Sequence, residues 1–445
     1  MDSTNLADRL RAIVGTKPGT STARLRPRPT TAEVEPGPVE AVGSGFGRIG
    51  GDVARVLGGE WLRHDGLSCF VVARRHGPET TLGRDRLSTI AARLADASAV
   101  APLVMRVDPA RPPFVFFDLE TTGLSGGAGT YAFLVGCGAF DAEGGFITRQ
   151  FVLLRHADER QLLQMVGTEL APAGALVSFN GKSFDAPLIE TRHLFHRLEW
   201  TGSRLPHLDL LHPARRFWGD GAAGAAPCSL VALERSVLGA RRPGDVPGSA
   251  IPARYFQFVR SGDARPLAGV LEHNRLDLLS LAGLTARLLD LVRAGPGAAR
   301  HPREALALGR AYAGRGFDGR AREAYESAIA GTEASMAGTE ASMASVRIAG
   351  LRALALLSRR GRHYEDAAAH WRALLALPGC SPRLAREASE ALAVHHEHRA
   401  RDLPAARAFA LRIGPAGNPA VQHRLARIER KMNNSHVSSF KFEVS

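Results

Sequence analysis

Residues 114–120, FVFFDLE, join four large apolar side chains directly to two carboxylates. A short apolar run of this kind predicts a buried central strand. Side chains two apart on a strand share a face, so we expect Asp118 and Glu120 to point the same way. Two like charges side by side at the edge of an apolar layer are costly unless a cation neutralises them. This strand end therefore predicts a site for a positive group.

Strand and helix signals alternate on both sides of that run. Residues 130–140 and 146–155 predict two further strands separated by a glycine-bearing turn, and residues 175–180 predict another. Helical spacing follows residues 157–170, and a long amphipathic helix is predicted from residue 264 to 292. Three strands in sequence, followed by strands that alternate with helices, predict a layered α/β sheet with flanking helices.

The 445 residues are too many for one ordinary domain. Composition and periodicity divide the chain at four points. The predicted parts are a disordered leader rich in Gly, Pro, Ser and Thr at 1–60, a small preface segment at 61–110, the α/β domain at 111–294, helical repeats at 300–430 and a flexible tail at 431–445. We expect the α/β domain and the repeats to fold independently.

The part after residue 296 is rich in Ala, Leu and Arg, which favours an all-α region. Gly309, Tyr312, Ala321, Tyr325 and Ala328 follow the spacing of small and aromatic residues in tetratricopeptide repeats. Two weaker copies follow. A perfect duplication of GTEASMA at 331–344 is expected in a connection between helical hairpins, where the chain can loop out.

The net charge of +13 permits phosphate binding but does not identify it. Only four of the 57 basic residues are lysine, and arginine with abundant alanine and glycine is a common signature of GC-rich coding sequence. The excess is spread over the chain and is heaviest at residues 301–430, where it reaches +7.

Targeting signals and cysteines point to a cytoplasmic protein. The first fifteen residues carry acids and no apolar core, which disfavours a secretory signal. The longest uncharged apolar stretch, residues 128–140, is too short to cross a bilayer, so no membrane partner is expected. The four cysteines lie far apart without a CxxC pair, which excludes a zinc knuckle and a disulfide framework.

Two further acids stand in similar surroundings. Asp185 follows a predicted strand in SFNGKSFDAP, and Asp277 lies on the long predicted helix, with His273 one turn earlier on the same face. Acids without cysteine offer oxygen donors, which suit Mg²⁺ or Mn²⁺ better than zinc. Two such ions a few ångströms apart can activate a water and stabilise the leaving oxygen of a phosphodiester.

These residues carry a resemblance. DLETTG, NGKSFDAP and HNRLD are similar, in order and type, to the three motifs of the DEDD, or DnaQ-like, 3′–5′ exonucleases with the ribonuclease H-like fold. The wider pattern between residues 63 and 292 resembles the predicted bacterial exonuclease family typified by YprB, which often carries tetratricopeptide repeats behind the nuclease domain. The resemblance implies an α/β ribonuclease H-like mixed sheet followed by an all-α repeat domain.

The resemblance also implies roles for individual residues. Asp118, Glu120, Asp185 and Asp277 would be the carboxylates of two Mg²⁺ or Mn²⁺ ions, with Asp118 bridging both. His273 would take the general-base position, although it precedes Asp277 by four residues, whereas the histidine branch of the family uses five. Contacts to the 3′-terminal nucleotide would come from the second motif and the turn after the first, namely Thr121, Thr122, Gly123, Leu124 and Asn180.

The implied function is a metal-dependent nuclease, a 3′–5′ exonuclease whose substrate is the 3′ end of DNA or RNA. The repeats would bind a protein partner or extend the substrate track. The rival interpretation is a non-catalytic adaptor in which the nuclease fold only binds nucleic acid. We favour the enzyme, because a silent module has no reason to keep four mutually repelling carboxylates.

Several other residues have competing interpretations. Asp209 either caps the following helix or lies near the site. The two histidine groups, His193 with His196 and His395 with His396 and His398, have near-ligand spacing but no accompanying cysteine or carboxylate pattern, and we expect them on the surface. The aromatic residues between Arg254 and Arg260 could line a nucleic-acid groove, but their helical spacing favours the core.

Overall fold

The structure is a computed structural model that describes residues 46–95, 110–123, 129–219, 228–334, 340–414 and 418–442. Residues 48–445 belong to one compact unit. Most of the predicted leader, residues 1–45, lies outside the described residues, as do residues 335–339 of the duplicated segment. Within the predicted leader, α2 (Phe46–Leu57) is helical, so the prediction of disorder is wrong for its last part.

The described residues form a seven-stranded mixed sheet in the order β1-β2-β7-β6-β5-β8-β9. The β5–β8 and β8–β9 pairs are parallel and the other pairs are antiparallel. The strands are β1 (Glu60–His64), β2 (Leu67–His76), β5 (Phe114–Thr121), β6 (Ala132–Phe140), β7 (Phe146–Val152), β8 (Ala175–Ser178) and β9 (His207–Asp209), and β3 (Thr81–Leu82) pairs with β4 (Asp85–Arg86) in a separate ribbon.

Strand β5 is apolar along its first half because both of its faces are covered. Phe114 and Phe116 pack into the core beneath α10, whereas Val115 and Phe117 pack into the core on the opposite face. Successive side chains of a strand alternate between faces, so a strand in the middle of a three-layer fold needs an unbroken apolar run. This confirms the central strand predicted from FVFF.

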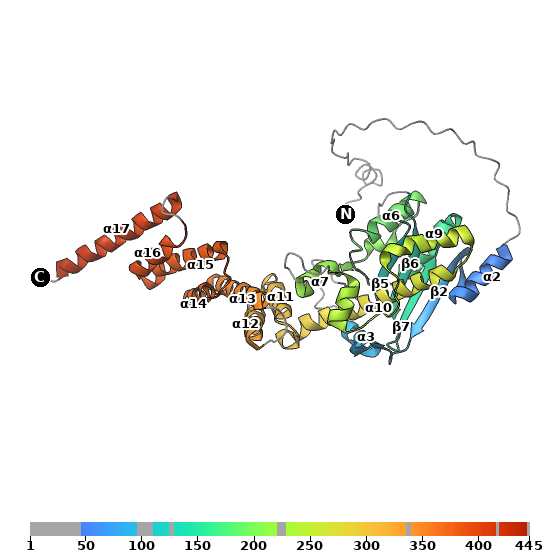
Figure 1. Ribbon diagram of the computed structural model, residues 1–445, viewed down its shortest axis with the longest axis horizontal. Helices are drawn as coiled ribbons and strands as arrows, with labels where there is room; N and C mark the ends of the chain where they lie inside the picture. The colour runs from blue at the N-terminus through green and yellow to red at the C-terminus, as the bar shows by residue number, and fades with distance from the viewer. Residues whose placement is uncertain are drawn as a thin grey trace, which may run out of the picture. The chain divides into compact units, whose positions relative to one another are not determined.

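Helices cover both faces of the sheet (Figure 1), and the long α10 runs along β5, β6 and β7. The helices of this part are α3 (Leu87–Ala95), α5 (Glu159–Leu170), α6 (Asp185–Phe195), α7 (Leu211–Trp218), α8 (Leu230–Leu233), α9 (Ile251–Ser261) and α10 (Arg265–Ala294). Short helical turns connect them at His156–Asp158, Thr201–Arg204, Glu234–Leu238, Gly248–Ala250 and Pro296–Ala298.

The predicted preface segment is part of the sheet. β2 pairs with β7 over seven residues, from Phe70 opposite Val152 to His76 opposite Phe146. Phe70, Val71 and Val72 are buried, and β1 then adds one more antiparallel strand. The domain boundary predicted at residue 111 is therefore too late, because β2 satisfies the edge of β7 that would otherwise be exposed.

The C-terminal part is all-α, as predicted. Consecutive helices pack against each other (Figure 1). They are α11 (Pro302–Ala313), α12 (Asp318–Ala334), α13 (Glu340–Arg360), α14 (Tyr364–Leu375), α15 (Pro382–His395), α16 (Leu403–Leu411) and α17 (Pro419–Phe442), with a π-helical turn at His396–Ala400. The Gly309 position of the repeat pattern has a physical reason, since a Cβ there would lie 2.4 Å from the Tyr325 ring. Assignment to the tetratricopeptide family stays a prediction.

Two predicted features of this part need revision. The predicted flexible tail begins inside α17, which continues as helix to Phe442. Among the described helices, α13 is long and apolar enough to cross a membrane by length and composition, but half of that window is buried inside the protein. We therefore interpret α13 as a core helix of the all-α part. The cytoplasmic location stays a prediction.

The two parts share one core, contrary to the expectation that they fold independently. Residues of α10, α7 and α11 belong to the same hydrophobic cluster. Glu304 on α11, which is 4% exposed, accepts hydrogen bonds from Trp218 Nε1 at 2.8 Å and from Arg287 Nη2 at 2.9 Å. Burial lowers the pKa of Arg287 even though the Glu304 charge opposes that shift. A cut at Ala294 would remove α11 from this junction.

We expect Glu304→Ala to lower the free energy of unfolding by about 3–5 kcal/mol, because it leaves the buried Arg287 without its partner. Urea denaturation followed by circular dichroism measures this loss. Glu323→Ala, which changes an exposed acid on the neighbouring α12, is the control and should stay within about 0.5 kcal/mol of wild type. A loss below about 1 kcal/mol for Glu304→Ala would show that the junction does not hold the two parts together.

Candidate active site

Strand β5 carries Asp118 and Glu120 to the edge of the buried layer. Both residues are partly buried and lie on the face that Phe116 shares, which is the face covered by α10. The β5–β6 pairing changes register between Glu120 and Thr121, so the strand becomes irregular directly after the two acids. Such a bulge ends regular pairing and aims side chains away from the sheet.

Helix α10 supplies the residue that holds Asp118. Asn274 is fully buried, and its Nδ2 donates a hydrogen bond to Asp118 Oδ2 at 2.8 Å. Its Oδ1 in turn accepts from Gln150 Nε2 on β7 at 2.9 Å. The close approach of the helix requires Gly136 on β6, because a Cβ there would lie 2.2 Å from Asn274 Oδ1. This chain of amides fixes both the rotamer of Asp118 and the height of α10 over the sheet.

Asp185 stands at the first position of α6, after the turn that follows β8. Asp209 at the end of β9 holds that turn, because its carboxylate accepts hydrogen bonds from the backbone N–H groups of Asn180 at 2.7 Å and Lys182 at 3.1 Å. It also accepts from the N–H of Leu211, the first residue of α7, at 3.0 Å. Asp209 therefore serves both of the alternatives left open by the sequence, capping near α7 and positioning the turn before Asp185.

The four predicted carboxylates influence one another's ionisation. Burial raises the pKa of Asp118 well above its usual range, and the charges of Asp277, Glu120 and Asp185 raise it further. Burial likewise raises the pKa of Glu120, helped by Asp277 and Asp185. The pKa of Asp185 is raised to about 7 by burial and by Asp209. Three segments that are distant in the chain thus bring their acids close enough for the negative charges to repel one another.

Asp277 differs from the other three because a cation already contacts it. Arg242 Nη1 lies 2.6 Å from Asp277 Oδ1, and the Arg242 side chain is 2% exposed. Burial raises the pKa of Asp277, but Arg242 and His273 hold that rise back. Two further hydrogen bonds hold the Arg242 guanidinium in place. Its Nε donates to Glu234 Oε2 at 2.6 Å, and its Nη2 donates to Ser280 Oγ at 3.3 Å.

His273 is oriented by Asp245, an acid that was not predicted from the sequence. Its Nδ1 lies 2.8 Å from Asp245 Oδ1, and its Nε2 lies 3.5 Å from Asp277 Oδ2. Burial raises the pKa of Asp245, but the hydrogen bond to His273 and the charge of Arg242 outweigh it, so the net shift is downward. An ionised Asp245 is a hydrogen-bond acceptor for the Nδ1–H of His273, and this contact turns Nε2 toward Asp277.

The predicted substrate-binding residues line two irregular loops. Thr121 Oγ1 donates to Gly123 O at 3.0 Å, and Thr122 Oγ1 accepts from the N–H of Tyr131 at 3.0 Å, so both hydroxyls shape the loop after β5. Asn180 has a left-handed backbone, with φ of 66°, at the turn that Asp209 holds. Leu124 lies outside the described residues. The contact of these residues with a nucleotide stays a prediction.

Among the residues that the structure describes, no three His, Cys, Asp or Glu side chains stand in a ready-made metal-binding arrangement. The donor set nevertheless fits a hard divalent cation, because it consists of partly buried carboxylates that repel one another. Arg242 neutralises only one of them at close range. Asp118, Glu120 and Asp185 are left with charge that a bound cation would compensate.

Four residues that support the site were not predicted from the sequence, namely Asn274, Gln150, Arg242 and Asp245. Asn274 lies inside the third motif, HNRLD, and a polar residue on an otherwise buried face was its signal. Gln150 directly follows Thr148 and Arg149 in β7, so no break in an apolar run marks it in the sequence. Arg242 and Asp245 lie in an irregular connection with no periodicity, so local spacing contains nothing that points to them.

The other candidates serve the fold. His193 is buried against Trp200, and His395 and His396 are also buried, so the predicted surface position is wrong for these three. His398 is exposed, as predicted. His196 joins a buried group in which Glu159 binds Arg192. Of the aromatic residues on α9, Tyr255 and Phe258 belong to the core, as the helical spacing favours.

Two comparisons relate this geometry to known proteins. Residues 115–289 match a family model described as RNase_H_2, RNase_H superfamily, a range that contains the four carboxylates, Arg242, Asp245 and His273. The chain is also 34% identical over 265 residues to the uncharacterized protein YprB of Bacillus subtilis (strain 168). That alignment covers 58% of this chain and 59% of YprB, so the chain matches less than two thirds of that protein's length.

Proposed function

We propose that this chain, whose residues 115–289 form an RNase H-like domain, is a metal-dependent 3′–5′ exonuclease acting on DNA or RNA. The observation that carries the proposal is the meeting of Asp118, Glu120, Asp185 and Asp277 in one partly buried group whose negative charges raise the pKa of Asp118 and of Glu120. Nucleases of this superfamily generally use divalent metals. Like charges that are held close together lower the stability of a fold. A protein has a reason to keep such a group where the carboxylates bind a cation that takes part in a reaction.

The four carboxylates would hold two Mg²⁺ or Mn²⁺ ions. When bound, such ions supply a nucleophilic water at neutral pH and stabilise the charge that develops on the phosphate. The protein's own contribution is to hold its ligands still. Asn274 holds one oxygen of Asp118, and Arg242 holds one oxygen of Asp277. The other oxygen of Asp277 lies 3.5 Å from His273 Nε2.

His273 supplies the proton acceptor in this proposal. With Asp245 on Nδ1, the imidazole presents Nε2 toward the acids, where it would take the proton of the attacking water. Asp245 keeps the ring in that tautomer and orientation. The loop after β5, with Thr121, Thr122 and Gly123, and the turn at Asn180 would hold the 3′-terminal nucleotide, as in the exonucleases that the motifs resemble.

The ion pair between Arg242 and Asp277 favours a second candidate. A cation supplied by the protein itself compensates a carboxylate without any metal, as a non-catalytic nucleic-acid-binding adaptor would require. Only one of the four acids is paired in this way among the residues described. The enzyme therefore remains our first proposal.

The direct test uses single-stranded DNA and RNA oligonucleotides labelled at the 5′ or the 3′ end, together with a circular DNA. With Mg²⁺ or Mn²⁺ we expect the 3′ label to be released first as a mononucleotide and the 5′-labelled strand to shorten stepwise. EDTA should stop both reactions, and the circle should stay intact. Cleavage of the circle would show an endonuclease, and binding of the oligonucleotides without any hydrolysis would show the adaptor.

A further inference from the structure

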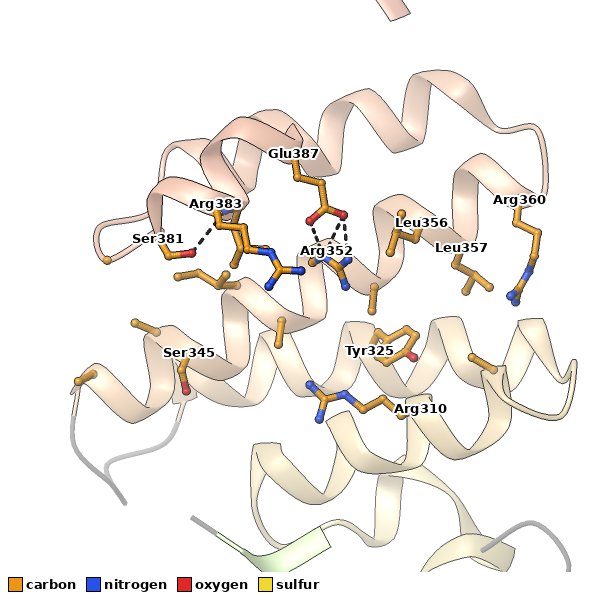
Figure 2. Close-up of a pocket in the computed structure, with 18 residues that line it drawn as sticks. Arg310, Tyr325, Ser345, Arg352, Leu356, Leu357, Arg360, Ser381, Arg383 and Glu387 are labelled. Atoms are coloured by element: carbon orange, nitrogen blue, oxygen red, sulfur yellow. Dashed lines mark hydrogen bonds and ion pairs between the residues drawn. The ribbon is translucent and has the colours of Figure 1, made fainter. Parts of the chain in front are cut away.

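An open groove with a volume of about 920 Å³ lies in the all-α part (Figure 2). Helices α11, α12, α13 and α15 all contribute to its lining. Its floor is made mostly of small and aliphatic residues, many of them alanine, and its charged residues are arginines with one glutamate. The groove is separate from the carboxylate site, whose last member, Asp277, lies on α10.

The arginines of the groove come from three successive odd-numbered helices. Arg310 lies on α11, Arg352 and Arg360 lie on α13, and Arg383 lies on α15. Figure 2 shows Arg383 and Arg352 reaching into the groove from its upper side and Arg310 from below. A single acid, Glu387, lines the groove with them. The lining thus carries an excess of positive charge.

Part of that charge is neutralised within the fold and part of it is not. Arg352 forms a bidentate ion pair with Glu387, in which Nη2 and Nε donate hydrogen bonds at 2.8 and 2.9 Å. Arg360 forms an ion pair with Asp318. Within the described part of the chain, the guanidinium groups of Arg310 and Arg383 make no hydrogen bond or ion pair. Two uncompensated arginines that face one groove favour an anionic ligand.

The shape and chemistry of the lining favour a polyanion bound through its backbone. The one aromatic residue of the groove, Tyr325, is 4% exposed, so it offers no surface on which a base could stack. Arginine matches phosphate in a bidentate geometry. Residues 301–430 also carry +7 of the chain's net charge of +13. These features suit phosphate contacts that do not depend on base identity.

We propose that this groove binds the sugar-phosphate backbone of the substrate strand, upstream of the 3′ end that enters the carboxylate site. The inference rests on the proposed nuclease function for the identity of the strand. Helix α10 continues for 17 residues from Asp277 to its end at Ala294, which is about 26 Å at 1.5 Å per residue. At roughly 3.4 Å per stacked nucleotide, a strand that runs the length of this part of α10 has about eight nucleotides. We therefore expect the groove to contribute to the binding of strands longer than about eight nucleotides and not to the binding of a 4-nucleotide strand.

The test measures binding with the full chain in EDTA, where metal-dependent hydrolysis is blocked. The probes are fluorescent 30-nucleotide and 4-nucleotide single strands of DNA and RNA, read by anisotropy. The variant Arg310→Gln/Arg383→Gln removes the two uncompensated charges, and we expect the Kd of the 30-nucleotide probe to rise about tenfold. The slope of log K against log salt should become shallower by about 1.4, for two lost phosphate contacts.

Two further variants control for charge and for folding. Arg386→Gln/Arg430→Gln removes the same charge from exposed arginines of the all-α part that do not line the groove, and it should leave the Kd unchanged. Glu387→Gln frees Arg352 and should tighten binding of the long probe. This gain in affinity cannot arise from a damaged fold.

Several outcomes would overturn the inference. An equal loss of affinity in the two double variants would show a general charge effect. An unchanged Kd for Arg310→Gln/Arg383→Gln would show that the strand does not reach the groove. If Arg310→Gln/Arg383→Gln lost binding to a poly-glutamate peptide but kept binding to the oligonucleotides, the groove would be assigned to an acidic protein partner. Because binding is read without metal, the result stands apart from the hydrolysis assay, whose failure would overturn the nuclease proposal alone.

Discussion

Asp118→Asn is expected to reduce hydrolysis by about 10³-fold or more while the protein stays folded. A metal ligand of this kind contributes several kcal/mol of transition-state stabilisation, and each 1.4 kcal/mol corresponds to tenfold in rate. The Tm of the metal-free protein should rise, because the change removes a buried charge that neighbouring acids disfavour. Asparagine can still accept the hydrogen bond from Asn274. Steady-state kinetics and thermal unfolding measure the two effects.

Asp277→Asn provides the matched comparison. Its loss of activity should be similar, but the gain in Tm should be smaller, because Arg242 already neutralises part of the Asp277 charge. Added Mn²⁺ should raise the Tm of wild type by mass action and that of both variants less. The exposed acid Glu143 provides a control, Glu143→Gln, which should behave as wild type in every measurement. Equal Mn²⁺-induced shifts in all four proteins would exclude a shared metal site.

His273→Gln is expected to lower the rate by about 10²–10⁴-fold, the usual range for a lost general base, while Mn²⁺ still raises the Tm. Asp245→Ala should lower the rate by a smaller factor, because the imidazole remains but its tautomer and orientation are no longer held. The double variant should be no slower than His273→Gln alone, since both changes remove one function. Single-turnover kinetics at saturating metal measures these rates.

The pH dependence separates the chemical role from a structural one. Protonation of an imidazole that acts as base lowers the rate on the acidic side, and His273→Gln should lose that limb. The control His212→Gln changes an exposed histidine and should keep both the rate and the limb. Additive losses in the double variant, or a His273→Gln enzyme that keeps its acidic limb and most of its rate, would place the base elsewhere.

The sequence alone determined the elements that carry the proposed chemistry. The apolar run before Asp118, and the spacing of His273 and Asp277, are local patterns with periods of two and 3.6 residues, and a strand or helix expresses them directly. The layered α/β sheet follows from the order of such patterns, whereas its mixed ribonuclease H-like arrangement was implied by the resemblance. The meeting of the acids was expected only from the resemblance, because the motifs are separated by up to 159 positions and their spacing contains no information about contact.

The tertiary structure alone decided how the site is supported. Asn274 reaches Asp118 across 156 positions, and Gly136 matters only because Asn274 lies against it. Arg242 and Asp245 sit in a connection without periodicity, and they reach Asp277 and His273 only through the packing of that connection on α10. The addition of β1 and β2 to the sheet, and the buried Arg287–Glu304 junction with the all-α part, have the same origin. Hydrogen bonds and charge pairs between distant segments depend on the folded geometry, whereas strands and helices follow from the local order of side chains.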